Sequence, residues 1–134
     1  MAIEYKDTKD FTAEELKRLF LSVQWSSGAY PERLVVALRN SDTVFSAWDG
    51  DRLIGLINVL DDSIMTAYIH YLLVDPEYQG QGIGKELTRM TLEKYKEYLR
   101  ILLNSYEDGV AFYESLGFKT GHGKYPMFVT TLTK

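Results

Sequence analysis

A chain of 134 residues with 46% hydrophobic and 25% charged residues is long enough to bury a sizeable core, and we expect residues 1–134 to form one domain. The absence of cysteine excludes disulfides, thiolate metal ligands and a cysteine nucleophile. A net charge of −4 argues against a nucleic-acid-binding protein, which would carry a basic stripe. No apolar run approaches the length of a membrane span and no secretory signal is evident, so we expect a cytoplasmic protein without membrane contacts.

The N-terminal part is predicted to form a short strand and two helices. Residues 3–6 alternate weakly, as a strand would. Thr12 and Glu15 form a capping box that begins a helix running to about Gln24. The apolar pattern then breaks, and Pro31 is well placed as the first residue of a second helix.

From residue 43 the hydrophobic period changes to that of strands. Residues 43–48 and 52–60 flank Asp49-Gly50-Asp51, which is a strong hairpin signal. A further turn at residues 61–63 leads into a β-rich apolar run over residues 68–74. Three strands in succession are therefore expected.

Three alternating glycines follow the third of these strands. The strand ends at Asp75-Pro76, the glycines are Gly80, Gly82 and Gly84, and apolar residues then recur at helical spacing to residue 98. A strand, a glycine loop and a helix start together direct bare backbone N–H groups and the positive end of a helix dipole to one place. This arrangement predicts a site for an anion, most often a phosphate.

The rest of the chain is predicted to add a strand, a helix and a final strand pair. Residues 100–104 form a short buried strand, parallel to its predecessor because a helix separates them. Residues 107–116 form a helix that Gly117 closes, and residues 118–123 and 127–132 form the last two strands. The element order predicts a mixed α/β sheet with helices on both faces.

The glycine loop fits neither of two common nucleotide motifs. In a Walker loop, Gly84-Lys85 would be followed by Ser or Thr rather than Glu86, and a further glycine would replace Gln79. A dinucleotide fingerprint would need a third glycine in place of Lys85. A plain tight turn remains an alternative, but three glycines cost about 0.5–1 kcal/mol each in backbone entropy without a return in packing. Residues 79–84 do match the pattern [QR]-x-x-G-x-[GA].

Two motifs together resemble the GNAT family of acetyl-coenzyme A (acetyl-CoA) dependent N-acetyltransferases. The first is V-D-P-E-Y-Q-G-Q-G-I-G at residues 74–84, and the second is F-Y-E-S-L-G-F at residues 112–118. The resemblance covers nearly the whole chain. It implies the acyl-CoA N-acyltransferase fold: an α/β protein with a mixed, mostly antiparallel sheet of six to seven strands, helices on both faces and splayed parallel central strands. It also implies transfer of the acetyl group to a primary amine of a small molecule or an amino terminus, by direct attack in a ternary complex.

The resemblance assigns cofactor residues along this stretch. The coenzyme A pyrophosphate would lie on the loop amides, at Gln79, Gly80, Gln81, Gly82, Ile83, Gly84 and Lys85. The pantetheine arm would pair with Leu72, Leu73 and Val74, where a bulge splays the parallel strands. The Leu73 N–H would polarise the thioester carbonyl, and Tyr113 would be the general acid for the departing thiolate. Where the family often has Asn and Ala before this tyrosine the chain has Tyr106 and Gly109, so Asn104 or Ser105 would take over a pantetheine contact.

The general base stays open at this point. Many relatives use a carboxylate on the central strand, but this strand offers His70 and Tyr71 instead. The base is then either His70 or a water chain between Tyr71, His122 and Tyr125. The two histidines lie far apart and offer no metal-ligand spacing, so no metal is expected.

The acceptor pocket implied by the family is aromatic and has no obvious carboxylate. Its residues would be Trp25, Tyr30, His70, Tyr71, His122 and Tyr125. Such a lining holds cations or planar apolar groups equally well, so the acceptor stays open. The family also makes a homodimer plausible, through a sheet edge or the C-terminal strands. The alternative to an enzyme is a non-catalytic coenzyme A-binding sensor or interaction module, which the missing carboxylate favours and Tyr113 opposes.

Overall fold

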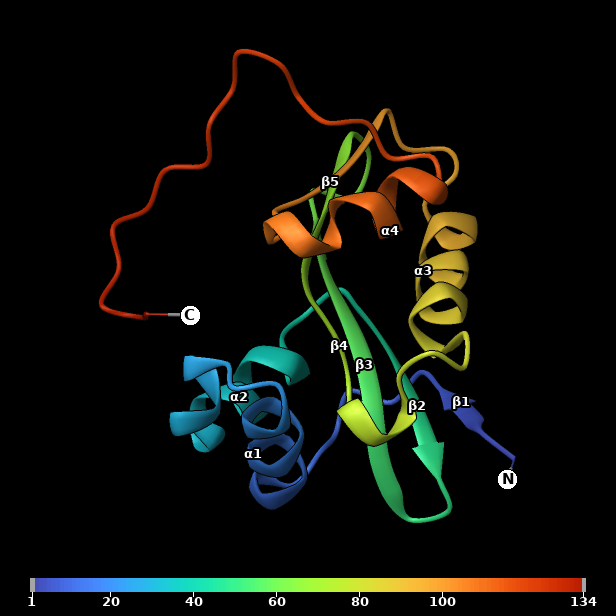
Figure 1. The fold of residues 1–134 in the computed structure, drawn as a ribbon, viewed down its shortest axis with the longest axis vertical. Coiled ribbons are helices and arrows are strands. Elements are labelled where there is room, and N and C mark those ends of the chain that lie inside the picture. The colour runs from blue at the N-terminus through green and yellow to red at the C-terminus, as the bar shows by residue number, and fades with distance from the viewer. Residues whose placement is uncertain (1, 134) are drawn as a thin grey trace.

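A sheet of five strands in the order β1-β2-β3-β4-β5 carries the fold (Figure 1). The computed structural model describes residues 2–133. The strands are β1 (Glu4–Lys6), β2 (Thr43–Asp49), β3 (Arg52–Asp61), β4 (Thr66–Val74) and β5 (Arg100–Leu103). Consecutive strands from β1 to β4 pair antiparallel, whereas β4 and β5 are parallel. The mixed, mostly antiparallel sheet that we expected is confirmed.

Four α-helices and three short 3₁₀ helices complete the described chain. The α-helices are α1 (Ala13–Ser22), α2 (Pro31–Arg39), α3 (Ile83–Lys94) and α4 (Val110–Ser115); the 3₁₀ helices span Ser26–Ala29, Pro76–Tyr78 and Glu107–Gly109. The capping box is confirmed, because the Glu15 N–H donates to Thr12 Oγ1 (3.1 Å) and the Thr12 N–H donates to Glu15 Oε1 (2.9 Å). None of the helices in residues 2–133 is long and apolar enough to cross a membrane.

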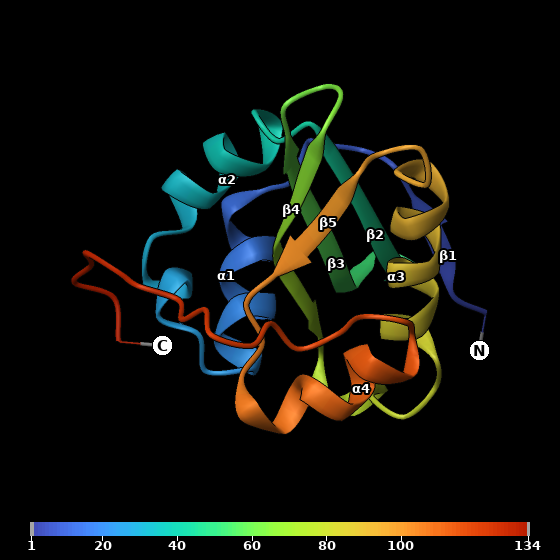
Figure 2. The same ribbon diagram turned by 90° about the horizontal axis from the view of Figure 1, so that it is seen from above.

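The helices bury their apolar stripes on opposite faces of the sheet (Figure 2). On one face, Leu16 and Phe20 of α1 and Leu38 of α2 are fully buried in a cluster with residues of β2, β3 and β4. On the other face, α3 contributes Ile83 and Leu87 to a second cluster. This two-sided burial confirms the expected layering, and it holds the start of α3 against the end of β4.

The two parallel strands diverge because β4 contains a bulge. Asn58 of β3 pairs with Tyr71 and Val59 pairs with Ile69, which leaves His70 as the extra residue. The Tyr71 N–H donates to the Asn58 side-chain oxygen at 2.9 Å. On its other side β4 pairs with β5 only from Thr66 to Ile69. The edge of β4 after the bulge therefore has no strand partner, as the splayed central strands of the predicted fold require.

The predicted final strand pair is wrong for this structure. Within the described residues no strand follows β5, and α4 ends at Ser115, two residues before Gly117, whose φ of +101° matches its predicted role of closing the helix. Residues 118–133, which we call the C-terminal tail, run as an extended segment away from the sheet (Figure 1). A strand needs a hydrogen-bonded neighbour and a buried face, and the tail has neither: Val129 is 106% exposed and Met127 90%. The sheet consequently has five strands instead of six to seven.

Candidate active site

Asp75 fixes the end of β4, where the glycine loop begins. Its side chain is almost fully buried, and it accepts hydrogen bonds from Arg18 Nη1 (2.9 Å), Arg52 Nη2 (3.4 Å) and the Glu77 N–H (2.9 Å). Burial alone would raise the pKa of Asp75, but the Glu77 amide and the two guanidinium groups hold that pKa below its ordinary value. A charged carboxylate therefore joins α1 and β3 to the start of the loop.

The glycine loop exposes its backbone. Gly80 and Gly82 have φ of +81° and +82°, and a Cβ at either position would meet no atom within 4 Å. The Gln79 side chain donates to the Val74 carbonyl at 2.9 Å, which ties the loop back to β4. Within the described chain, the N–H groups of residues 80–85 donate no hydrogen bond. These amides meet at the start of α3 and can accept an anion there.

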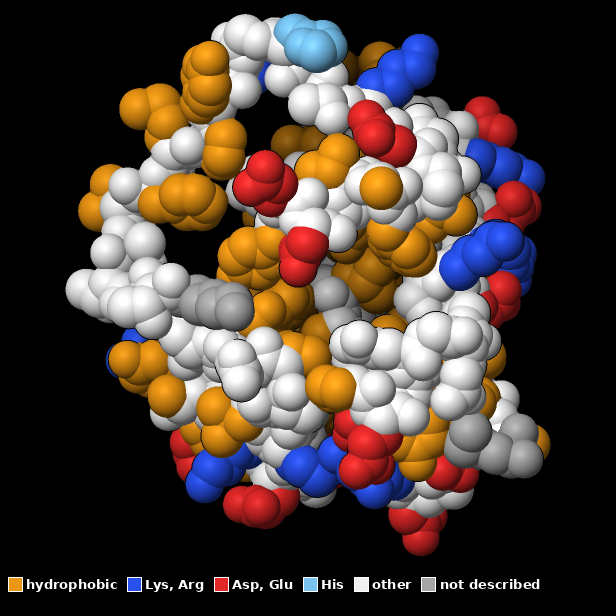
Figure 3. All heavy atoms as spheres, viewed as in Figure 1, with side chains coloured by type: hydrophobic (Ala, Val, Ile, Leu, Met, Phe, Trp, Pro, Cys, Tyr) orange, Lys and Arg blue, Asp and Glu red, His pale blue; other side chains and the backbone are white. Residues whose placement is uncertain are grey.

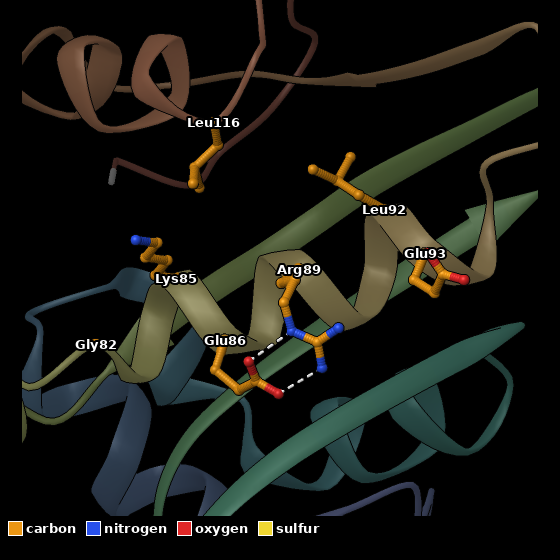
Figure 4. Close-up of a pocket in the computed structure, with 7 residues that line it drawn as sticks. All are labelled: Gly82, Lys85, Glu86, Arg89, Leu92, Glu93 and Leu116. Carbon is orange, nitrogen blue, oxygen red and sulfur yellow. Dashed lines mark hydrogen bonds and ion pairs between the residues drawn. The ribbon is translucent and has the colours of Figure 1, made fainter.

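A hollow of about 430 Å³ opens beside the loop, on the outer side of α3 (Figure 4). It extends from Gly82 along α3 to Glu93, with Leu116 facing the helix across it. Arg89 is neutralised by Glu86 through two bonds of 2.7 Å. Lys85 has neither an ion pair nor a side-chain hydrogen bond among the described residues, so its charge is available to a ligand on the loop amides.

The register of β4 corrects the choice of Leu73 as the amide that polarises a carbonyl. The Asp75 N–H donates to the Ile54 carbonyl at 2.8 Å, and the facing direction alternates along a strand of an antiparallel pair. The amides of Leu73 and Asp75 therefore face β3. The amides of Leu72 and Val74 face the opposite way, toward the edge that β5 leaves open. Leu72 is the residue whose N–H reaches the open edge nearest the bulge.

Tyr113 lies half-buried on α4, between Phe112 and Phe118 at ring-centroid distances of 5.1 and 5.6 Å. Burial raises the pKa of Tyr113 to about 12. Its hydroxyl makes no hydrogen bond within residues 2–133. A Cβ on Gly84 at the start of α3 would lie 3.6 Å from the Phe112 ring, so α4 is seated directly on the glycine loop. Tyr113 is thereby a protonated donor on a helix that packs against the start of α3.

The residue before this helix explains a departure from the family pattern. A Cβ on Gly109 would come within 2.8 Å of Ser105 Oγ and 3.7 Å of the Tyr113 ring. Ser105 Oγ in turn donates to the Tyr106 carbonyl at 2.7 Å. A glycine at position 109 thus leaves room for the Ser105 side chain. Asn104 is exposed after β5 and makes no contact in the described chain that would assign it a role.

An aromatic cluster at the bulge brings together Trp25, His70 and Tyr71, three of the residues that the resemblance assigns to the acceptor pocket. The His70 ring stacks on Tyr71 with centroids 4.0 Å apart, and burial lowers the pKa of His70 although the residue keeps an exposed surface. Trp25 lies 6.0 Å from Tyr71 and 6.2 Å from Tyr106. Tyr106 was missed as a site residue, although its replacement of the family's usual asparagine was visible in the sequence.

His122 and Tyr125 lie elsewhere than predicted. Both are exposed on the C-terminal tail, and neither has a ring contact with Tyr71. A water chain between Tyr71, His122 and Tyr125 is therefore not supported. The tail instead brings residues 129–132 to α2, where they line a cavity of about 580 Å³ with Tyr71 and the predicted Tyr30. Sequence reasoning could not find this contact because it depends on the path of the tail.

Comparison with known proteins agrees with this geometry. Residues 7–125 match the model of the acetyltransferase (GNAT) domain. The chain belongs to the GNAT family. An N-acetyltransferase of Prochlorococcus marinus, named ycf52-like and uncharacterized, is 34% identical over 110 residues, which is 78% of this chain and 61% of that relative. The chain thus spans less than two thirds of that relative's length.

Two further similarities bear on fold and chemistry. A GNAT-family acetyltransferase of Streptococcus pneumoniae superposes with a TM-score of 0.82 at 30% identity, over 97% of this chain and 99% of that one. The N-alpha-acetyltransferase 30 of Schizosaccharomyces pombe is 37% identical over 83 residues, 55% of each chain. This GNAT protein therefore shares its fold across nearly its whole length with a family acetyltransferase.

Proposed function

We propose that this GNAT protein transfers the acetyl group of acetyl-CoA to a primary amine, by direct attack of the amine in a ternary complex. The proposal rests on one observation: two sets of backbone groups without hydrogen-bond partners in the described chain lie next to each other. The loop amides of residues 80–85 and the open edge of β4 after His70 meet at the start of α3. The first set suits a pyrophosphate and the second suits an extended, amide-bearing arm.

The residues present fit acetyl-CoA, which would supply the acetyl group as a thioester. Gly80, Gln81, Gly82, Ile83 and Gly84 would hold the pyrophosphate through backbone N–H groups, with Lys85 adding a positive charge. The Gln79 N–H instead donates to the Pro76 carbonyl at 3.4 Å. Leu72 and Val74 would pair their outward-facing backbone with the pantetheine arm. The outer hollow along α3, near Lys85, would accept a further part of the coenzyme.

Three groups would then divide the chemistry. The Leu72 N–H would stabilise the negative charge that develops on the carbonyl oxygen as the N–C bond forms. Tyr113 would donate to the sulfur as the C–S bond breaks; with a pKa of about 12, it is a weaker acid than a thiol of pKa about 8.5, so it acts chiefly as a hydrogen-bond donor. His70, neutral at pH 7 because burial lowers its pKa, would accept the proton of the amine.

The acceptor we propose is a small molecule or a peptide amino terminus that enters beside Tyr71. The aromatic cluster at the bulge supports this entry, because Tyr71 belongs to it and also lines the cavity beside α2. An amino terminus stays in the proposal because one of the relatives is named an N-alpha-acetyltransferase. Nucleic acid and membrane are not proposed as partners.

We further propose a homodimer built by exchange of the C-terminal tail. The outer edge of β5 has no strand partner among the described residues, and residues 127–132 have a strand pattern but pair with nothing. Hydrophobic side chains gather along the tail, and openings separate it from the body of the molecule (Figure 3). The tail of a second copy would supply the strand that each sheet edge lacks.

The test combines ligand binding with turnover. We expect coenzyme A to raise the melting temperature, and free thiol to appear from acetyl-CoA only when an amine is added. Stabilisation by coenzyme A without turnover on any amine would favour the sensor or interaction module instead. Stabilisation by ATP or NAD but not by coenzyme A would contradict both assignments.

A further inference from the structure

The cavity beside Tyr71 carries a charge that the proposed chemistry does not use. Arg33, in the first turn of α2, lines it. The other lining residues are hydroxyl-bearing or apolar: Ser27, Tyr30, Leu34, Ala37, Tyr71, Val129, Thr130, Thr131 and Leu132. Arg33 is therefore the one charged side chain of the lining. The volume of about 580 Å³ is that of a small-molecule site.

Arg33 differs from the other arginines of the described chain in its partners. Ion pairs engage four of the others and a hydrogen bond engages the fifth: Arg18 and Arg52 with Asp75, Arg39 with Asp10, Arg89 with Glu86, and Arg100 with the Thr66 hydroxyl. The Arg33 guanidinium has no carboxylate partner and lies over the Tyr30 ring, 5.4 Å from its centre. A guanidinium on an aromatic face keeps its in-plane N–H donors free for a planar anion.

The lining of the cavity also includes a residue next to the proposed site of reaction. Tyr71 lines it, and its hydroxyl shares a 2.9 Å hydrogen bond with Ser27. Tyr71 directly precedes Leu72, whose N–H faces the open edge of β4. No Asp or Glu lines the cavity, so an ammonium group would find no counter-ion there. The cavity thus offers one cation, and it also borders the residue that precedes Leu72, where the amine would react.

We infer that the acceptor is a small molecule that carries a carboxylate remote from its amine, with the carboxylate on Arg33 and the amine beside Tyr71. The inference rests on the proposed acetyltransferase activity and gives it a substrate class. The cavity volume of about 580 Å³ favours a short free amino acid over an acidic peptide. Arg33 would be a specificity-determining residue without a part in the chemical step.

The experiment compares ω-amino acids of three chain lengths, 4-aminobutyrate, 5-aminopentanoate and 6-aminohexanoate, with their amides. Methylene spacers keep the basicity of the amine nearly equal within each acid–amide pair, so the carboxylate is the variable. We expect at least one acid to exceed its amide about tenfold in kcat/KM, mainly through KM. Arg33→Gln should abolish that ratio, and Arg33→Lys should retain part of it. Arg39→Gln on the same helix, outside the cavity, should leave it unchanged.

The outcomes separate the inference from the proposed function. Turnover with equal rates for every acid and amide, or an unchanged ratio in Arg33→Gln, would overturn the inference and leave the acetyltransferase standing. A peptide with an acidic side chain that outperforms all of the free acids would overturn the small-molecule assignment. If no amine is turned over, the carboxylate site can still be tested by binding pentanoate to the coenzyme A complex and following Trp25 fluorescence. We expect weaker pentanoate binding in Arg33→Gln than in the unmodified protein. Equal binding in the two proteins would contradict the carboxylate site.

Discussion

At the scale of single residues, His70 and Tyr113 are adjusted in opposite directions and end in the same charge state. Burial lowers the pKa of His70 and raises that of Tyr113 to about 12, so both are neutral near pH 7. A neutral imidazole can accept a proton and a neutral phenol can donate one. Aminolysis of a thioester needs an acceptor for the proton of the amine and gains from a hydrogen-bond donor to the departing sulfur, so this pair of shifts suits the proposed reaction.

Replacing Tyr113 with Phe removes the donor and leaves the ring in place. We expect kcat to fall by about 10²-fold, because a hydrogen-bond donor to charge that develops in the transition state contributes about that much, while coenzyme A binding is retained. Stability should change by less than about 0.5 kcal/mol, since the hydroxyl bonds to nothing in the described chain. Tyr125→Phe is the matched control, because that ring is exposed on the tail. Full kcat in Tyr113→Phe, measured by thiol release, would remove this tyrosine from the mechanism.

The lowered pKa of His70 predicts the acid limb of the rate profile. Its neutral form acts as the base, so kcat/KM should hold as the pH falls through about 6.5 and decline only below that value. The His70→Gln variant should lose the limb together with most of the rate. A flat profile between about pH 5.5 and 8 in the unmodified protein speaks against His70 as the base.

The same shift carries a stability consequence with a definite sign. Because folding disfavours the charged imidazole, the unfolded chain binds more protons than the folded protein below about pH 6.5. The free energy of unfolding should therefore decrease as the pH is lowered through this range. His70→Gln should flatten that part of the stability curve in denaturant titrations. An identical pH dependence in both proteins would show that His70 is not shielded.

At the scale of elements, the glycine loop joins a strand to a helix through backbone in the left-handed region. Gly82 has a φ of +82° at the position before α3, so it sets the direction in which the loop amides point. Open space around it means that a side chain would be strained without clashing. A substitution at Gly82 should therefore change the backbone conformation of the loop without disturbing the packing of its neighbours.

The role of the loop backbone can be tested by comparing Gly82→Ala with Gly50→Ala, a matched substitution in the β2–β3 turn. Both glycines have positive φ and open surroundings, so each substitution should cost about 1–2 kcal/mol of stability. Only Gly82→Ala should weaken coenzyme A, by about tenfold in the calorimetric Kd. Equal affinities for the two variants would mean that the loop amides do not hold the coenzyme.

Elements with local signals were predictable from the sequence, and those with distant partners were not. The Thr12–Glu15 box and Gly117 act within one helical turn, and both lie where expected. The choice between Leu72 and Leu73 depends on register, which shifts at His70 and reverses the direction of each following amide. The position of the tail depends on which strand edge it meets. No short window of sequence encodes that choice.

At the scale of the whole molecule, the C-terminal tail decides how much apolar surface remains uncovered. Tyr125, Met127, Phe128 and Val129 are each at least 69% exposed along one short segment. Such a contiguous run is unusual for a monomer and typical of an interface. Because residues 129–132 also wall the acceptor cavity, tail exchange would link assembly to the acceptor site.

Charges on the tail should separate the copies. Met127→Glu with Phe128→Glu places two carboxylates in the exchanged segment, and we expect a dimer in the unmodified protein and a monomer in this variant by sedimentation equilibrium. Ile64→Glu with Met65→Glu is the control, since these residues are also apolar and exposed but lie in the β3–β4 turn. Both variants should keep the unfolding free energy of the isolated chain within about 1 kcal/mol, because neither touches the buried clusters. A monomeric unmodified protein, or a dimer that only the Ile64–Met65 variant dissociates, would contradict exchange of the tail.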